Sequence, residues 1–261
     1  MMEYHVCIVE GIHDVHVLQK VLRLQQFSSI QRKNELDPYW FDVLPKQYPT
    51  NREGDLYKRP DVPYFMEKDR KQIAIISANG EDNLSNVLKM LDVQLDLNTL
   101  SSISLFADAD ERTAREKYEW LTKQLRGTVF DSYIDANVYP AVHQENLRLG
   151  IYIFPDNKRT GTLEDVLLAG GEEEYPELMR EAEKYIGAVE NQRPKGARAK
   201  NFKGASRHKM QFGVMTNVFK PGKANQVSIA DNDWISTQTV ERVESHQKLF
   251  TFIQQLIGEE S

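Results

Sequence analysis

Residues 6–14, VCIVEGIHD, constrain the fold more than any other stretch of the chain. Their apolar first half predicts a buried strand, and the apolar residues at helical spacing from Val15 to Leu22 predict an amphipathic helix directly after it. Gly11 permits the sharp turn between the two. Glu10 therefore comes at the carboxyl end of a strand, where open α/β sheets place their ligands.

Two interpretations of this turn stay open. Glu10 is either a turn or capping residue, or a metal ligand or general acid/base that needs partners elsewhere in the chain. Asp14 lies where the N-cap of the helix is expected. The local sequence does not decide between these roles.

Partners occur at two further strand ends. The run 103–107 predicts a second buried strand, and Asp108 and Asp110 follow it, so both carboxylates can turn toward one hard cation. The run 150–154 predicts another strand, followed by Asp156 and by Glu164 at a helix start. Three strand ends that each deliver acids predict one shared acidic site.

These motifs carry a family resemblance. Glu-Gly-x-x-Asp after the first strand and Asp-x-Asp after a later one resemble the Toprim domain of topoisomerases, bacterial primases and OLD-type nucleases. The stretch GIYIFPDN with its following GTLED resembles, more narrowly, the Toprim-related DUF3226 family, and this resemblance runs from about residue 4 to the C-terminus.

The resemblance implies a set of site residues. It implies that Glu10 is the acid/base of nucleotidyl transfer or hydrolysis and that Asp108 acts with it. It further implies Mg²⁺ or Mn²⁺ held by Glu10, Asp108 and Asp110, with Asp14 and Glu164 placing a second ion. His13 and His16 are left out, since an oxygen site for a hard cation does not need them.

The predicted architecture is α/β and Toprim-like, with a mostly parallel central sheet and helices on both faces. We expect a core over residues 1–170 with an insertion at about 28–70, and a C-terminal helical extension over residues 171–261. Further elements are expected at the strand 72–76, at a helix from Leu84 to Leu91, and at a helix over about 112–125.

Several local expectations follow from caps and apolar stripes. Asp110 has an alternative role as a helix cap, and the box from Thr162 to Asp165 explains Asp165 without function. Asp156 has a competing turn role. Two apolar faces are expected to pack inward: Leu178, Ala182, Tyr185, Ile186 and Val189 on a helix from 175 to 189, and Val240, Val243, Leu249, Ile253 and Leu256 on a helix that follows the core anchor Trp234.

Charge and cysteine content limit the class of protein. The 261 residues carry a formal net charge of −6, which argues against a charge-driven, histone-like nucleic-acid binder. The single cysteine, Cys7, is expected to be a packed core thiol in a reducing compartment. No apolar run has the length of a membrane span. We expect a cytoplasmic protein that does not associate with membranes.

One basic block stands out in this acidic chain. Residues 193–209 contain seven Lys or Arg residues and no acid. Cations beside acidic metal ligands suit a phosphodiester substrate, so a nucleic-acid partner is predicted. The alternative is a solvated loop. The candidate phosphate contacts are Lys195, Arg198, Lys200 and Lys203.

Three functions are compatible with these features. The first is a Mg²⁺- or Mn²⁺-dependent nuclease, and the second is a non-catalytic Toprim-like module that binds a nucleotide or a protein. The third, nucleotidyl transfer as in a primase or topoisomerase, would need a separate subunit. The resemblance to OLD-type nucleases also leaves open an ATPase partner protein or a homo-oligomer.

Overall fold

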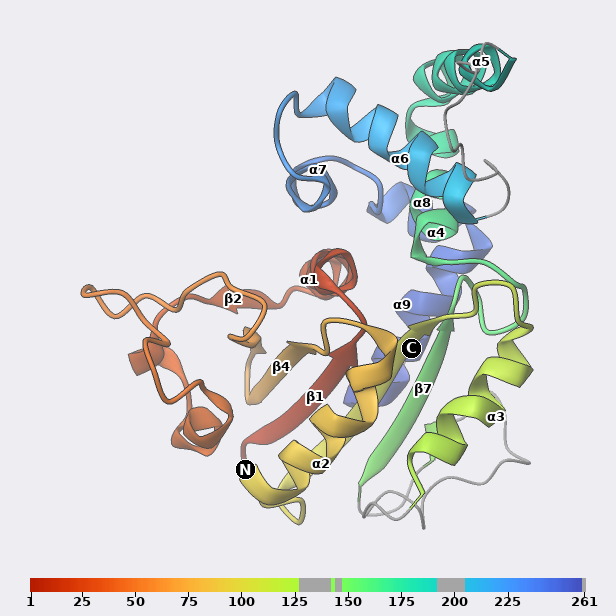
Figure 1. Ribbon diagram of the computed structural model, residues 1–261. Coiled ribbons are helices and arrows are strands. Elements are labelled where there is room, and N and C mark those ends of the chain that lie inside the picture. The colour runs from red at the N-terminus through yellow and green to blue at the C-terminus, as the bar shows by residue number, and fades with distance from the viewer. Residues whose placement is uncertain (127–141, 144–146, 192–204, 260–261) are drawn as a thin grey trace.

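The computed structural model describes residues 1–126, 142–143, 147–191 and 205–259 (Figure 1). These residues form a seven-stranded sheet in the order β2-β3-β4-β1-β5-β7-β6. The strands are β1 (Glu3–Val9), β2 (Ser28–Ile30), β3 (Tyr64–Lys68), β4 (Lys71–Ser77), β5 (Leu100–Asp108), β6 (Val142–His143) and β7 (Arg148–Phe154).

The four central strands β4, β1, β5 and β7 run parallel to one another. The outer strands β2, β3 and β6 pair antiparallel at the two edges. Continuous apolar runs in β1, β5 and β7 fit this placement, because central parallel strands are buried on both faces. The expected α/β class with a parallel centre is confirmed.

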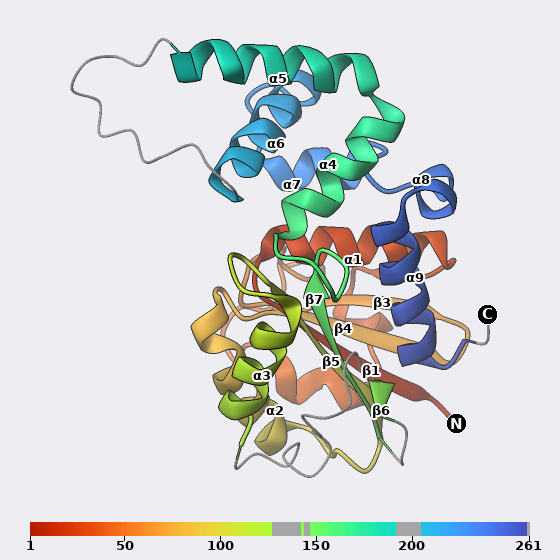
Figure 2. The same ribbon diagram turned by 90° about the vertical axis from the view of Figure 1, so that its right-hand side faces the viewer.

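Helices cover both faces of the sheet (Figure 2). Helices α1 (Ile12–Leu24) and α9 (Glu244–Ile257) lie on one face, and α2 (Leu84–Gln94) and α3 (Ala114–Gln124) lie on the other. On the first face, Phe252 of α9 meets Phe106 of β5 edge-on, with ring centroids 5.7 Å apart. Each face therefore has its own apolar core, as the apolar stripes predict.

The segment at about 28–70 is attached to the sheet rather than separate from it. It contains β2, the 3₁₀ helices η1 (Lys33–Glu35) and η2 (Pro38–Val43), and β3, and β2 pairs antiparallel with β3. Trp40 is fully buried, and its Nε1 donates a hydrogen bond to Gln72 Oε1 of β4 at 3.0 Å. The insertion thus widens the sheet beyond β4.

The later helices form a layer above the carboxyl ends of the strands (Figures 1 and 2). They are α4 (Leu163–Glu174), α5 (Pro176–Asn191), α6 (Ala205–Phe219), α7 (Asn225–Asp231) and α8 (Thr237–Arg242). None of the described helices is long and apolar enough to span a membrane.

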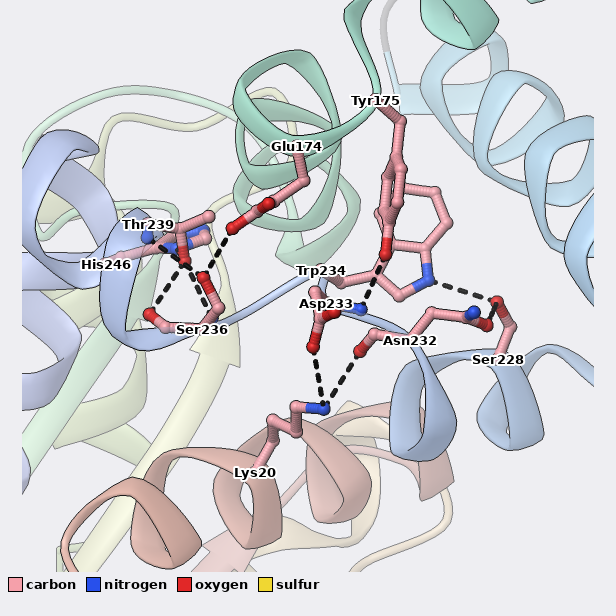
Figure 3. Close-up of polar contacts among 10 residues, drawn as sticks. All are labelled: Lys20, Glu174, Tyr175, Ser228, Asn232, Asp233, Trp234, Ser236, Thr239 and His246. Carbon is pink, nitrogen blue, oxygen red and sulfur yellow. Dashed lines mark hydrogen bonds and ion pairs between the residues drawn. The ribbon is translucent and has the colours of Figure 1, made fainter.

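Trp234 anchors this layer, as expected from its sequence context (Figure 3). Its side chain is fully buried, and its Nε1 donates to Ser228 Oγ at 3.0 Å. Close by, Lys20 of α1 donates to the Asn232 carbonyl oxygen at 2.9 Å. His246 of α9 donates from Nε2 to the Val166 carbonyl oxygen of α4 at 2.9 Å. The segment between α7 and α8 is therefore joined to α1, and α4 is joined to α9.

The structure corrects one helix face and the extent of one helix. On α5, Ala182 and Ile186 are buried as expected, but Leu178, Tyr185 and Val189 are exposed, because α6 covers only one side of α5. The expected C-terminal helix is two helices, since α8 ends at Arg242 and the extended Val243 precedes α9.

The structure also corrects two caps. Asp14 lies inside the first turn of α1, where Gly11 is the N-cap. Asp110 does not cap α3, because Thr113 does so by accepting a hydrogen bond from the Glu116 amide. The short polar side chain of Thr113 suits this role better than a residue three positions upstream.

The close approach of α4 to the Trp234 segment gives a stability prediction. A Cβ at Gly170 would lie 1.9 Å from the Trp234 carbonyl oxygen, whereas one at Gly187 of α5 would meet nothing within 4 Å. We expect Gly170→Ala to lower the free energy of unfolding by about 2 kcal/mol or more. Gly187→Ala should raise it by up to about 1 kcal/mol, because alanine favours helix. Urea unfolding measures both, and equal effects would contradict the packing.

Candidate acidic site at the strand ends

Two acids meet where adjacent parallel strands end. Glu10 directly follows β1, and Asp108 is the last residue of the neighbouring strand β5. The Asp108 amide donates a hydrogen bond to Glu10 Oε1 at 3.1 Å. Parallel strands present their carboxyl ends at one edge, so residues 98 positions apart become direct neighbours.

A second contact brings the start of α4 to the same edge. The Leu163 amide, at the first position of this helix, donates to Asp108 Oδ1 at 2.7 Å. Asp110, in the left-handed region at φ 56°, exchanges two backbone hydrogen bonds with Gly161, at 2.8 and 2.9 Å. Glu164 follows in the first turn of α4 and is buried. The loop before α4 is therefore pinned beside Asp108.

Asp14 completes the group from the side of α1. Its carboxylate accepts a hydrogen bond from the Gly11 amide at 2.9 Å, and its side chain is buried. The structure thus brings together five acids predicted from the sequence: Glu10, Asp14, Asp108, Asp110 and Glu164.

Burial and mutual repulsion disfavour the charged forms of these acids. Burial raises the pKa of Asp14 to about 7, with a further contribution from the charge of Glu10. Burial, followed by repulsion from Asp14, Glu10 and Glu164, raises the pKa of Asp108 well above its usual range. Burial also raises the pKa of Glu10. Bound cations would relieve this repulsion.

A buried lysine offsets part of the charge. Lys117 of α3 has only 1% of its side chain exposed, and its Nζ lies 2.7 Å from Glu81 Oε1 and 3.7 Å from Glu10 Oε1. A buried ammonium group requires such partners, because water no longer solvates it. Lys117 therefore fixes the Glu10 carboxylate from the α3 side.

Helix α6 contributes two basic side chains to this group. Lys209 Nζ lies 4.0 Å from Glu164 Oε2, and His208 Nδ1 lies 2.6 Å from Asp165 Oδ1. Burial opposes the charged form of Lys209, but the attraction of Glu164 and Asp108 outweighs it and raises the pKa of Lys209. On α1, His13 Nδ1 lies 4.0 Å from Glu164 Oε1.

Some predicted residues have other roles or lie elsewhere. Asp165 accepts a hydrogen bond from the Thr162 amide at 2.7 Å, which confirms the predicted capping box. Asp156 accepts from the amides of Lys158 and Arg159, which confirms its turn role. The candidate phosphate contacts Lys195, Arg198, Lys200 and Lys203 lie outside the described residues.

The sequence interpretation did not single out Lys117, His208 or Lys209. A signal for Lys117 exists, because it lies on the buried stripe of α3 with Ala114 and Leu121, where a charged residue needs a partner. His208 and Lys209 close the basic block, but nothing local in the sequence directs them toward Glu164 and Asp165. Their position depends on the packing of α6 against α4.

The donor set suits a hard cation in type, since it consists of carboxylate oxygens. Glu10 and Asp108 each use one oxygen for a backbone amide, and no hydrogen bond from the described residues engages the other. The described residues contain no group of three or more His, Cys, Asp or Glu side chains already arranged to hold a metal ion.

The raised pKa of Asp14 gives a prediction for the protein in EDTA. Its pKa is about 7 in the fold and near 4 in the unfolded chain, so the folded state binds more protons between these values. The free energy of unfolding should therefore fall as the pH rises from about 4 to about 7. Asp14→Asn, whose amide oxygen can still accept the Gly11 hydrogen bond, should flatten this dependence and stabilise the protein at pH 8 by on the order of 2 kcal/mol.

Asp69→Asn serves as the matched control, because Asp69 is exposed in the turn before β4. It therefore lies at the amino end of that strand, whereas the acidic site lies at the carboxyl ends of the parallel strands. Its left-handed backbone, at φ 52°, accepts asparagine without strain. Chemical denaturation at a series of pH values measures both variants. A pH dependence unchanged by Asp14→Asn would contradict the electrostatic description.

Comparisons with known proteins place the chain in a family without a described activity. A search of curated proteins finds no match. Among solved structures, the crystal structure of hypothetical protein PH0156 from Pyrococcus horikoshii OT3 is similar, with a TM-score of 0.55 and 20% sequence identity. The match covers 98% of this chain and 95% of that one, and at this identity it shows a shared fold alone.

The family assignment rests on a match to almost the whole chain. The model of the family described as "Protein of unknown function (DUF3226)" matches residues 4–258. This protein therefore belongs to the DUF3226 family.

Proposed function

We propose that the protein hydrolyses phosphodiesters in a nucleic acid with the help of Mg²⁺ or Mn²⁺. One observation carries the proposal: Glu10 and Asp108, joined by a hydrogen bond at two strand ends, share a buried edge with Asp14 and Glu164. Such concentrated negative charge is costly without a function. The resemblance of these motifs to Toprim domains supports the same assignment.

Glu10, Asp108 and Asp110 would hold one cation, and Asp14 and Glu164 would help to place a second. When bound, such ions supply positive charge that stabilises the negative charge developing on a phosphate during hydrolysis. Metal binding would require these acidic side chains to rotate. The described residues contain no group of three or more such side chains already arranged as ligands.

Glu10 is the proposed general acid/base. Its pKa is raised by burial, which brings it nearer to neutral pH, where a carboxyl group can exchange a proton efficiently. Lys117 is a positioning residue, since its ammonium group lies 3.7 Å from Glu10 Oε1 while Glu81 holds it in place. The hydrogen bond from the Asp108 amide further restricts the Glu10 carboxylate.

The proposed substrate contacts are cations around the acidic edge. Lys209 has 53% of its side chain exposed beside Glu164, so it can reach a phosphate as well as a carboxylate. The basic block that leads into α6 would extend this surface through Lys195, Arg198, Lys200 and Lys203. Phosphate contacts of this kind hold a strand without selecting its sequence.

A non-catalytic module is the second candidate. The lack of a ready ligand group among the described residues favours it, because the acids could then serve the fold or a bound nucleotide instead. In that case Asp14 and Asp108 would act mainly through the hydrogen bonds that they accept at the starts of α1 and α4.

Cleavage assays with Mn²⁺ on single-stranded DNA, duplex DNA and RNA test catalysis. We expect Asp108→Asn and Glu10→Gln each to lower the cleavage rate by about 100-fold or more, because each removes a negative charge from the proposed ion site. The asparagine at 108 can still accept the Leu163 hydrogen bond, so the fold is kept. Asp69→Asn should cleave at the unaltered rate. Cleavage that persists in Asp108→Asn would end the assignment.

Metal binding can be measured without activity. A cation that binds only the folded protein raises its melting temperature. We expect Mn²⁺ to raise the melting temperature of the unaltered protein and of Asp69→Asn, but not that of Asp108→Asn. A rise without cleavage would favour the non-catalytic module, whereas an equal rise in all three proteins would place the ion elsewhere.

A further inference from the structure

A cavity lies between α1 and the strands β2 and β3. It measures about 650 Å³ and is bounded by α1, by β2 and β3 with the loop between them, and by the end of α7. Cavities of this size hold small ligands of the cofactor or nucleotide class. The side chains that matter here are Gln19, Arg23, Tyr57, Lys58 and Tyr64.

The cavity carries more positive charge than its ion pairs use, although Arg23 also attracts Asp231. Its two acids are each in an ion pair: Asp55 with Arg32 at 3.2 Å and Asp231 with Lys220 at 2.8 Å. Within the described part of the chain, Arg23 and Lys58 form no ion pair, and Arg23 makes only a long hydrogen bond of 3.4 Å to Ser29 Oγ. Two cations that line one cavity and form no ion pair with the described residues suit a phosphate group.

The same cavity offers groups suited to a base. Tyr64 is half-buried and meets His16 edge-on at 5.8 Å, and Tyr57 is exposed with the Arg59 guanidinium 5.5 Å from its ring centre. Base–aromatic stacking contributes substantially to nucleotide binding.

Gln19 adds a hydrogen-bonding group. The residue is only 6% exposed, and its side-chain amide makes a single weak contact, from Nε2 to Met66 Sδ at 3.9 Å. No hydrogen bond from the described residues reaches its carbonyl oxygen, which is not among the fully buried side-chain atoms without a partner and so stays accessible. A side-chain amide of this kind can pair with the edge of a nucleobase.

We propose that this cavity binds a nucleotide, with the phosphate on Arg23 and Lys58, the base against Tyr57 or Tyr64, and the amide of Gln19 at the base edge. The cavity lies close to the acidic site, since His16 lines it and His13, one turn earlier on α1, faces Glu164. The nucleotide is either free or the end of a strand. Binding here does not require hydrolysis at the acidic site.

Calorimetric titration in EDTA tests the site without metal. The probes are adenosine 5′-monophosphate, a 5′-phosphorylated dinucleotide, adenosine and inorganic phosphate. We expect a nucleotide to bind at least about tenfold more tightly than adenosine or phosphate, because only a nucleotide engages both halves of the cavity. If both nucleotides bind, the ligand of this cavity can be a free nucleotide. If only the dinucleotide binds, the site takes a strand end.

The variant Arg23→Gln/Lys58→Gln should weaken nucleotide binding by about tenfold or more, because charge-assisted hydrogen bonds are lost. Arg115→Gln is the matched control, since Arg115 is an exposed arginine on α3, on the opposite face of the sheet. If the double variant unfolds, Lys58→Gln alone keeps the test, because Lys58 lies outside any helix or strand.

Two outcomes would overturn the site: no binding of either nucleotide, or binding that Arg23→Gln/Lys58→Gln leaves unchanged. Affinity for phosphate equal to that for the nucleotides would overturn its assignment to a nucleotide. Asp108→Asn should bind nucleotide as the unaltered protein does. A failed cleavage assay therefore leaves the cavity proposal standing, and a failed titration leaves the cleavage proposal standing.

Discussion

The hydrogen bond from the Asp108 amide to the Glu10 carboxylate is the contact on which the acidic site depends. It joins the ends of two neighbouring strands, and the Asp108 carboxylate continues the chain of contacts to the first amide of α4. Backbone amides are suitable anchors for carboxylates, because they partly replace lost water without adding a mobile side chain. The strand ends, the loop before α4 and α4 itself are thereby held in one arrangement.

This arrangement concentrates like charges in a region with little water. The raised pKa values of Asp14 and Asp108 express the resulting repulsion. Lys117 from below and Lys209 from above reduce it, but neither removes it. Sites with such uncompensated charge lower the stability of the fold, and a bound cation restores that stability. The electrostatics of the fold and the proposed chemistry therefore have the same origin.

Helix α1 separates two regions of opposite character. Its first turn carries Asp14 and His13 beside the acids, whereas its later turns carry Gln19 and Arg23 along the basic cavity. The insertion contributes Tyr57 and Lys58 to that cavity, so it supplies more than extra strands at the sheet edge. One rigid helix can fix the distance between the proposed phosphate-binding surface and the acidic edge, which a loop could not do as well.

The sequence by itself determined the four central strands, the helices α1, α2, α3 and α5, and the three acid-bearing strand ends, because apolar periodicity and local turn chemistry are encoded over a few residues. It also located the Thr162–Asp165 box and the buried Trp234. Tertiary structure alone decided which face of α5 is covered and that His208 and Lys209 reach Asp165 and Glu164. These contacts depend on how separate helices pack, and helix packing is fixed by the shape of the whole core rather than by any short stretch of sequence.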